Sequence, residues 1–229
     1  LCIGQPWEFM GIVKAMLATG IRPDFIVVDG GEGGTGAAPV EFTDHLGTPM
    51  REGLLFVHNT LVGAGLRDQI RIGAAGKITS AFDIASVLAI GADWANAARG
   101  FMFALGCVQS LSCGTNRCPT GVATQDPLRQ RALVVPDKAE RVHQFHRTTL
   151  KALSEMLAAA GIRHPSDLRP HHLARRISQT EIKLFSQLHV FLRPGELLTG
   201  EEGRSFYSES WRLARADRFD LEEPATARV

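Results

Sequence analysis

The pattern of apolar and polar positions predicts short strands that alternate with helices. Each expected strand is a brief apolar run followed by a small-residue exit and, in most cases, by an apolar stripe at helical spacing. The strands are expected near residues 1–3, 24–28, 70–73 and 94–97. The helices between them are expected to begin near Pro6, Glu52 and Ser80 and to end near Gly20, Gly63 and Gly91. This alternation predicts parallel strands joined by right-handed crossovers.

Four strand–helix units make half of an eight-stranded (β/α)8 barrel, or most of a doubly wound sheet. Small-residue exits follow the third and fourth strands, at Gly76-Lys77 and Arg99-Gly100. They favour the barrel, because its phosphate site follows its last two strands. The prediction is therefore the carboxyl-terminal half of a TIM barrel, with the first half preceding Leu1 in a longer polypeptide.

Three segments are expected along the chain. Residues 1–130 are predicted to form the half-barrel with a cysteine-rich loop, and residues 131–198 a helical extension that packs on it. A long helix is expected over about residues 138–160, where apolar positions keep helical spacing. Residues 199–229 are charged near their end and lose periodicity, which predicts a loosely packed tail.

Composition and charge narrow the possible partners and location. The chain has 229 residues, of which 45% are hydrophobic and 21% are charged, with a formal net charge of +1. These values are typical of a globular protein and give no global field that would attract nucleic acid or an anionic membrane. The sequence shows no apolar run of the roughly 18 residues that a membrane span needs. We therefore expect a cytoplasmic protein with neither a nucleic-acid partner nor a membrane span.

The stretch from Gly106 to Pro127 holds three of the four cysteines, Cys107, Cys113 and Cys118. Their C-x5-C-x4-C-P spacing is wider than that of common zinc ligand pairs, and zinc would also need a fourth ligand. Three thiolates can hold a cluster that lacks one corner iron, and a Cys-Pro pair is typical of the last ligand in bacterial ferredoxins. The competing interpretation is three unrelated buried cysteines. Cys2 is expected to be a buried strand cysteine.

Two further loops are candidate binding sites. Gly76-Lys77 and Arg99-Gly100 could offer backbone N–H groups to a phosphate, with Arg99 adding a charged fork, or could be tight turns needed only for barrel closure. The loop that begins at Gly30 lets a backbone approach a planar or charged ligand closely. Glu32 in this loop could bind an amine or transfer a proton, although an exposed loop carboxylate is an equal alternative.

These features together resemble the flavin domain of glutamate synthase and its shorter FMN-binding relatives. The resemblance rests on Gly33-Gly34-Thr35-Gly36-Ala37, on Leu66-Arg67-Asp68, on the cysteine spacing, and on the Cys-Pro-x-Gly-Val-Ala-Thr-Gln run that ends at Gln125. It implies an FMN-binding barrel with a 3Fe-4S cluster on the loop after the last strand. It further implies that 2-iminoglutarate, formed from 2-oxoglutarate and ammonia, is reduced to L-glutamate.

The resemblance also implies residue roles. Cys107, Cys113 and Cys118 would ligate iron, and an electron donor, either ferredoxin or an NAD(P)H-oxidising subunit, would reduce the cluster. The FMN phosphate would lie at Gly76, Lys77, Arg99 and Gly100. Flavin and substrate would face the loop residues Gly30, Gly33, Gly34, Thr35 and Gly36, with Glu32 as the candidate catalytic residue.

Two departures from the family pattern leave alternatives. The phosphate turn usually has two glycines, and its second position is Lys77 here; the usual His-Asp before Gly-Gly-Thr-Gly reads Gly31-Glu32. The alternatives are an N-methylglutamate synthase-like subunit, a non-catalytic iron–sulfur electron-transfer subunit, and a phosphate-binding barrel with a catalytic thiol. We expect this segment alone neither to close a barrel nor to turn over substrate.

Overall fold

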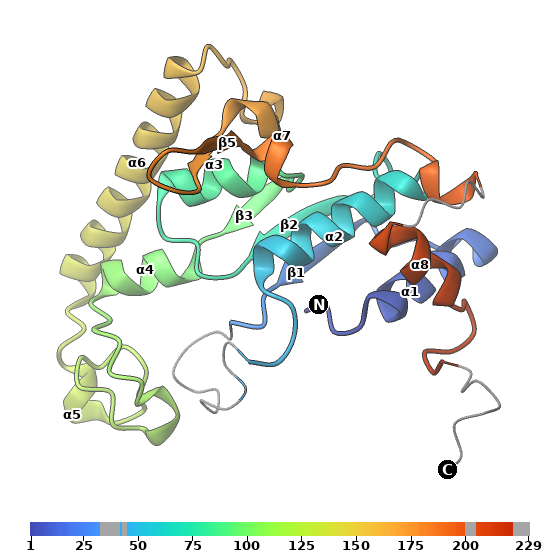
Figure 1. The fold of residues 1–229 in the computed structure, drawn as a ribbon. Helices are drawn as coiled ribbons and strands as arrows, with labels where there is room; N and C mark the ends of the chain where they lie inside the picture. The colour runs from blue at the N-terminus through green and yellow to red at the C-terminus, as the bar shows by residue number, and fades with distance from the viewer. Residues whose placement is uncertain (33–41, 43–44, 200–204, 222–229) are drawn as a thin grey trace.

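The computed structural model describes residues 1–32, 42, 45–199 and 205–221 (Figure 1). A parallel sheet has the strand order β1 (Phe25–Asp29), β2 (Arg71–Ala75) and β3 (Trp94–Asn96). Helix α1 (Pro6–Thr19) precedes β1, α2 (Met50–Gly63) and α3 (Ala81–Ala89) connect the strands, and α4 (Ala98–Leu105) follows β3. The parallel α/β alternation is thereby confirmed. That this unit is half of a (β/α)8 barrel stays a prediction.

The predicted strand at residues 1–3 lies in the expected place but is reduced to a single bridge. Cys2 pairs with Asp29 in parallel but is exposed, so the expectation of a buried cysteine is wrong. The backbone N of Asp29 donates to the carbonyl of Leu1 at 2.8 Å, and the amino terminus donates to Val27 O at 2.7 Å. The amino-terminal segment therefore lies beside β1, on the edge opposite to β2.

Local capping explains where the helices begin and end. Ser80 Oγ accepts from the backbone N of Asp83 at 3.1 Å, and the Asp83 carboxylate accepts from the backbone N of Ser80 at 3.1 Å, which makes a capping box for α3. Gly20 ends α1 with φ of 74°, a left-handed conformation that glycine adopts without strain. Both boundaries match those expected from the sequence.

The main core lies between the sheet and the helices on one of its faces, with α2 running across that face (Figure 1). Val28 and Ile72 on the strands and Leu54 and Val57 on α2 are fully buried. The opposite face of the sheet carries Phe25, which is 57% exposed and whose ring meets that of Trp94 edge to face at 5.6 Å.

Helix α6 (Val135–Ala159) packs on α3 and α4 and begins three residues before the expected start. Its buried Leu153 and Leu157 form a second core with the alanines of α3. Of the helices that the structure describes, none has the length and apolar character needed to cross a membrane.

Two parts of the carboxyl-terminal region differ from the sequence-based expectation. An antiparallel hairpin, β4 (Ala174–Arg176) and β5 (Ile182–Leu184), interrupts the expected helical extension. Helix α8 (Phe206–Leu213) packs on α1 within the expected loose tail. The remaining short segments are α5 (Pro127–Gln130), α7 (Phe185–Leu188) and the 3-10 turns Cys113–Thr115, Pro165–Asp167, Pro170–His172 and Glu196–Leu198.

The expectation of a loose tail is wrong for residues 205–221 because distant contacts hold them. Tyr207 is 9% exposed, and its hydroxyl accepts from Asn59 Nδ2 on α2 at 2.8 Å. The Lys14 ammonium donates to Ala214 O at 2.9 Å. These contacts join residues so far apart in sequence that the segment alone does not reveal them.

Candidate functional site

The exits of β1 and β2 lie against each other at the carboxyl edge of the sheet. A Cβ on Gly76 would lie 2.8 Å from the Cβ of Met50 and 3.7 Å from the backbone N of Gly30. A Cβ on Gly30 would lie 2.7 Å from the backbone N of Met50, and one on Gly31 would lie 2.5 Å from Leu46 O. Backbone crowding therefore requires glycine here, and two of the predicted loops meet as parallel strands dictate.

Glu32 lies at the amino end of α2. Its two carboxylate oxygens accept from the backbone N of Met50, the first residue of that helix, at 3.0 and 3.1 Å. A carboxylate at this position satisfies an otherwise unpaired N–H group and complements the helix dipole. Glu32 is therefore a helix cap in this structure, and its chemical role stays a prediction. The other residues predicted for this loop, Gly33, Gly34, Thr35 and Gly36, lie outside the described residues.

The turn after β2 has an unusual backbone. Gly76 has φ of 156° and Lys77 has φ of 48°. The left-handed region costs a residue with a Cβ about 1 kcal/mol relative to glycine, so glycine would be the less strained residue at position 77. Turns with such backbone angles can present N–H groups to an anion, in keeping with the predicted phosphate contact.

Arg99 and Gly100 belong to the first turn of α4, directly after β3. The residue before this helix, Ala97, makes no side-chain hydrogen bond that caps it, and the first N–H groups of a helix suit an anion. Gly100 also has a packing role: a Cβ there would lie 2.7 Å from Cζ of Phe145 on α6 and 3.4 Å from Thr79 O. The close approach of α4 to α6 thus requires this glycine independently of any ligand.

The cysteine loop, residues 106–127, lies beyond the end of α4, beside α5 (Figure 1). Gly106 ends α4 with φ of 110°, and Cys107 follows it. Cys113 begins a 3-10 turn, and Cys118 is buried, with 6% of its surface exposed. The three cysteines are thus placed on one loop, as the spacing predicted.

Side chains of the cysteine loop hold its shape. Asn116 has a left-handed backbone with φ of 60°, and its Oδ1 accepts from Thr124 Oγ1 at 2.8 Å and from the backbone N of Gln125 at 2.6 Å. Gln130 Nε2 donates to Thr124 O at 2.8 Å. The loop around Cys118 is therefore ordered by its own hydrogen bonds.

The pKa of the Cys118 thiol is lower than that of an ordinary cysteine. A hydrogen bond with the Thr120 hydroxyl, 3.5 Å from the sulfur, is the largest cause that lowers the pKa of this thiol to about 7. Backbone N–H groups of Ala123, Thr120 and Val122 act in the same direction, and burial opposes them. Iron binds the thiolate, so the donor chemistry at Cys118 fits a metal ligand.

The three thiols are not assembled as a metal site. Within the described part of the chain, which includes all four cysteines, no group of three or more His, Cys, Asp or Glu residues could hold a metal ion. His143 and His146 on α6 do not complete such a group. The donor types fit a cluster, and the ligand set stays a prediction.

Left-handed backbone is concentrated in the candidate sites. Among the described residues, the non-glycine positions with positive φ are Lys77, Gln109, Leu111 and Asn116. The first is in the predicted phosphate turn, and the other three are in the cysteine loop. Strained backbone of this kind tends to cluster at functional sites, because the surrounding structure must hold it in place. This signal cannot be obtained from spacing alone.

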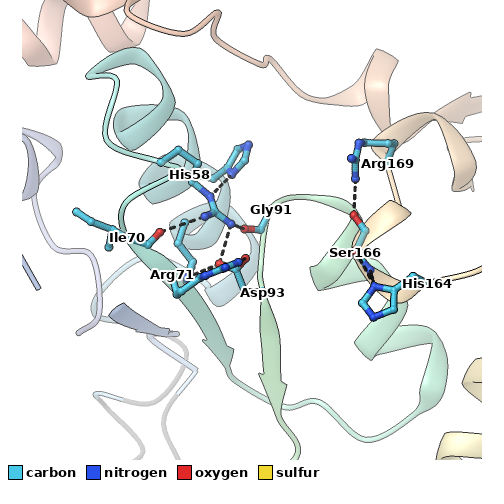
Figure 2. Close-up of polar contacts among 10 residues, drawn as sticks. His58, Ile70, Arg71, Gly91, Asp93, His164, Ser166 and Arg169 are labelled. Atoms are coloured by element: carbon cyan, nitrogen blue, oxygen red, sulfur yellow. Dashed lines mark hydrogen bonds and ion pairs between the residues drawn. The ribbon is translucent and has the colours of Figure 1, made fainter. Parts of the chain in front are cut away.

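Arg67, in the Leu-Arg-Asp motif, joins the starts of two strands. Its Nη2 donates to Gly91 O at 2.9 Å and to Asp93 Oδ2 at 2.8 Å. Its Nη1 donates to Ile70 O at 3.1 Å, and its Nε donates to His58 Nδ1 at 3.2 Å (Figure 2). The motif identifies the residue, but only the structure reveals this role at the edge opposite to the glycine-rich exits.

Comparison with known proteins gives consistent matches. Residues 8–163 match the family model described as a conserved region in glutamate synthase. The chain is 41% identical over 193 residues to the glutamate synthase large subunit-like protein YerD of Bacillus subtilis, covering 84% of this chain and 37% of that protein. It is 38% identical over 146 residues to the archaeal glutamate synthase [NADPH] of Methanocaldococcus jannaschii, covering 64% of this chain and 29% of that protein.

More distant matches include a plant enzyme and one solved structure. Ferredoxin-dependent glutamate synthase 1 of Arabidopsis thaliana is 39% identical over 128 residues, covering 56% of this chain and 8% of that protein. A mutant flavocytochrome b2 with pyruvate bound matches with a TM-score of 0.37 and 14% identity, covering 69% of this chain and 36% of that chain. A TM-score this low defines no fold.

The matched proteins are named as glutamate synthases or as a glutamate synthase large subunit-like protein. The family region covers more than half of the chain, and the chain belongs to the glutamate synthase family. It spans little more than a third of the length of the Bacillus YerD protein and less of the other relatives.

Proposed function

We propose that this chain is part of a glutamate synthase-type oxidoreductase, which reduces 2-iminoglutarate, formed from 2-oxoglutarate and ammonia, to L-glutamate. Membership of the family supports the proposal. The names of two relatives specify NADPH and ferredoxin, which supports an electron donor of one of these kinds, ferredoxin or an NAD(P)H-oxidising subunit.

The observation that carries the proposal is that one short helix joins the two candidate cofactor sites. Arg99 and Gly100 lie in the first turn of α4, and Cys107 follows the glycine that ends it. Eight residues of α-helix extend about 12 Å. A flavin phosphate at one end and a cysteine-held cluster at the other would therefore be neighbours.

Two separate sets of residues would bind the two cofactors. Backbone N–H groups of Gly76, Lys77 and Gly100, with the Arg99 guanidinium, would hold the FMN phosphate, and Cys107, Cys113 and Cys118 would hold the 3Fe-4S cluster. When bound, FMN would supply a hydride to the imine carbon, and the cluster would deliver the donor's two electrons one at a time.

The imine nitrogen must gain a proton as the carbon gains the hydride. Glu32 is the candidate donor in the loop after β1. Its carboxylate accepts from the backbone N of Met50, so proton transfer would require Glu32 to leave the amino end of α2. The same loop, Gly30–Gly36, would face flavin and substrate.

A catalytic thiol is less well supported than a ligand thiol. The lowered pKa of Cys118 would suit a nucleophile as well as a ligand. With 6% of its surface exposed and its own loop around it, however, Cys118 offers a substrate little access. An N-methylglutamate synthase-like activity is distinguished by an assay of methylamine against ammonia.

Anaerobic purification of the full-length protein, with an iron, sulfide and flavin count, tests the proposal. We expect a 3Fe-4S stoichiometry and bound FMN, and loss of most of the iron in Cys107→Ser, Cys113→Ser and Cys118→Ser. Cys2→Ser is the matched control, because Cys2 lies at the sheet edge and is expected to leave the iron unchanged. Full iron retention in the three loop variants would contradict the cluster assignment.

A further inference from the structure

A pocket of about 980 Å³ lies at the amino-terminal edge of the sheet, at the opposite end of the strands from the glycine-rich exits. One wall is formed by the Arg67 network at the starts of β2 and β3. The facing wall is formed by residues 164–170, around the 3-10 turn Pro165–Asp167. Figure 2 shows His58, Arg71 and Asp93 on one side and His164, Ser166 and Arg169 on the other.

The positive charge in this pocket is only partly neutralised. Asp93 pairs with Arg67 at 2.8 Å and with Arg71 at 3.2 Å, so one carboxylate is shared by two guanidinium groups. Arg169 Nη1 donates to Ser166 O at 2.7 Å and to Leu168 O at 2.8 Å. Carbonyls do not cancel a charge, and among the described residues no carboxylate pairs with Arg169. Arg71 is 73% exposed and Arg169 is also exposed.

The rest of the lining combines polar and apolar groups. His164 Nδ1 lies 2.6 Å from Ser166 Oγ and accepts from the backbone N of Ser166 at 3.2 Å, so these two contacts fix the orientation of the imidazole ring. Leu88 on α3 and Phe191 supply apolar surface. Asp68 is the second carboxylate of the lining, and its charge disfavours a ligand with several negative charges.

We propose that this pocket binds a small organic anion, in which a single carboxylate or phosphate group is attached to an apolar body. The anionic group would lie between Arg71 and Arg169, and the apolar part would lie on Leu88 and Phe191. The volume falls within the range of about 300–1,000 Å³ that is usual for small-molecule sites, which commonly pair apolar walls with a few polar groups. This site is separate from the proposed flavin and cluster sites.

Calorimetric titration of the full-length protein with simple probes tests the site. Benzoate and phenyl phosphate carry the two candidate anionic groups on one ring, benzyl alcohol is the uncharged match, and inorganic phosphate lacks the apolar part. We expect saturable binding of benzoate or phenyl phosphate, whichever group the pocket prefers, and at least about tenfold weaker binding of the other two probes.

Arginine variants then locate the binding. Arg71→Gln and Arg169→Gln should each weaken the binding of the preferred probe about tenfold or more, because each removes a charge-assisted hydrogen bond. Arg163→Gln is the matched control, since Arg163 is exposed, lies beside the same segment and does not line the pocket. If Arg169→Gln disrupts the turn at residues 164–170, the binding measured for Arg71→Gln still tests the proposal, because Arg71 is exposed and its substitution should not disturb the fold.

Three outcomes would overturn the proposal. The first is that neither benzoate nor phenyl phosphate binds saturably. The second is that benzyl alcohol binds as tightly as they do, which would show an apolar site only. The third is that Arg163→Gln weakens binding as much as Arg71→Gln, which would show a general effect of surface charge.

Discussion

Glu32 and Met50 are joined by a hydrogen bond between the loop after β1 and the first residue of α2. Both carboxylate oxygens of Glu32 lie within 3.1 Å of the Met50 backbone N. The residue best suited by sequence to transfer a proton therefore also caps a helix. Its two roles compete, because a carboxylate held by the helix start is not available to a substrate.

The capping role predicts a loss of stability on substitution. Glu32→Ala should lower the free energy of unfolding by about 1 kcal/mol, because it removes the acceptor at the amino end of α2. Glu32→Gln keeps an oxygen acceptor and should cost less. Urea denaturation of the chain measures both. Glu155→Ala is the control, since Glu155 is an exposed residue within α6; a loss in that variant equal to that of Glu32→Ala would argue against a cap.

Gly100 is predicted to be required for the packing of α4 on α6. In Gly100→Ala, the new methyl group would meet the Phe145 ring, and overpacking of this kind costs about 1–3 kcal/mol. Phe145→Leu should recover part of that loss in the double variant, as thermal or urea unfolding would show. Gly4→Ala is a suitable control, because its neighbour is the flexible Glu8 carboxylate at 3.3 Å. Additive effects of Gly100→Ala and Phe145→Leu would contradict the contact.

His58 is predicted to make stability depend on pH. Burial, with the neighbouring Arg67 charge, lowers the pKa of His58 to about 4, while Asp93 and the Gly91 backbone oppose this shift. Since the folded pKa lies below the unfolded value, stability is fully present above about pH 6.5 and is lost as the pH falls toward 4. The contribution of His58 to this loss is on the order of 3 kcal/mol.

Urea unfolding from pH 7.5 to pH 4.5 tests this prediction. His58→Gln keeps an acceptor for Arg67 but does not titrate, so it should show a flatter decline than the unsubstituted chain. The two proteins differ only at this residue, so the difference between the two curves isolates His58. Parallel curves would show that His58 does not carry the pH dependence.

The sequence predicts those elements whose signals are local. Helices α1, α2 and α3 have apolar stripes with glycine or capping residues at their ends, and their boundaries were predicted closely. The β4–β5 hairpin was missed because its strands are three residues each and mostly exposed, so they carry little pattern. Helix α8 was missed because its anchor, Tyr207, contacts Asn59 at a separation of 148 residues.

In the candidate site, too, local features were predicted from the sequence and contacts between separate elements were not. The sequence placed Cys107, Cys113 and Cys118 on one loop after the last strand, but helix α4, which lies between that strand and the loop, was not predicted. Spacing could not reveal that Glu32 caps α2 or that Gly100 faces Phe145, because both facts depend on how separate elements pack. Relative positions of thiols on an irregular loop likewise depend on its backbone angles, which the residue types do not determine.

Lys77 provides a test of the phosphate turn that separates backbone from side chain. Its φ of 48° is left-handed, a conformation that glycine adopts freely and that a residue with a Cβ adopts only at a cost in free energy. Lys77→Gly and Lys77→Ala both remove the same side-chain contacts, so their difference reports the backbone alone. We expect the glycine variant to be more stable than the alanine variant by about 1 kcal/mol, the reverse of the order in a helix.

The same two variants, Lys77→Gly and Lys77→Ala, also test whether residue 77 contacts the flavin. If the backbone N–H of residue 77 contacts the FMN phosphate, Lys77→Gly should retain flavin better than Lys77→Ala, because glycine keeps the turn without strain. Flavin content after purification and fluorescence titration with FMN measure this. Equal stability of the two variants would show that the turn is not left-handed at this position. Equal flavin loss in both, with the stability order as expected, would instead assign the phosphate contact to the lysine ammonium.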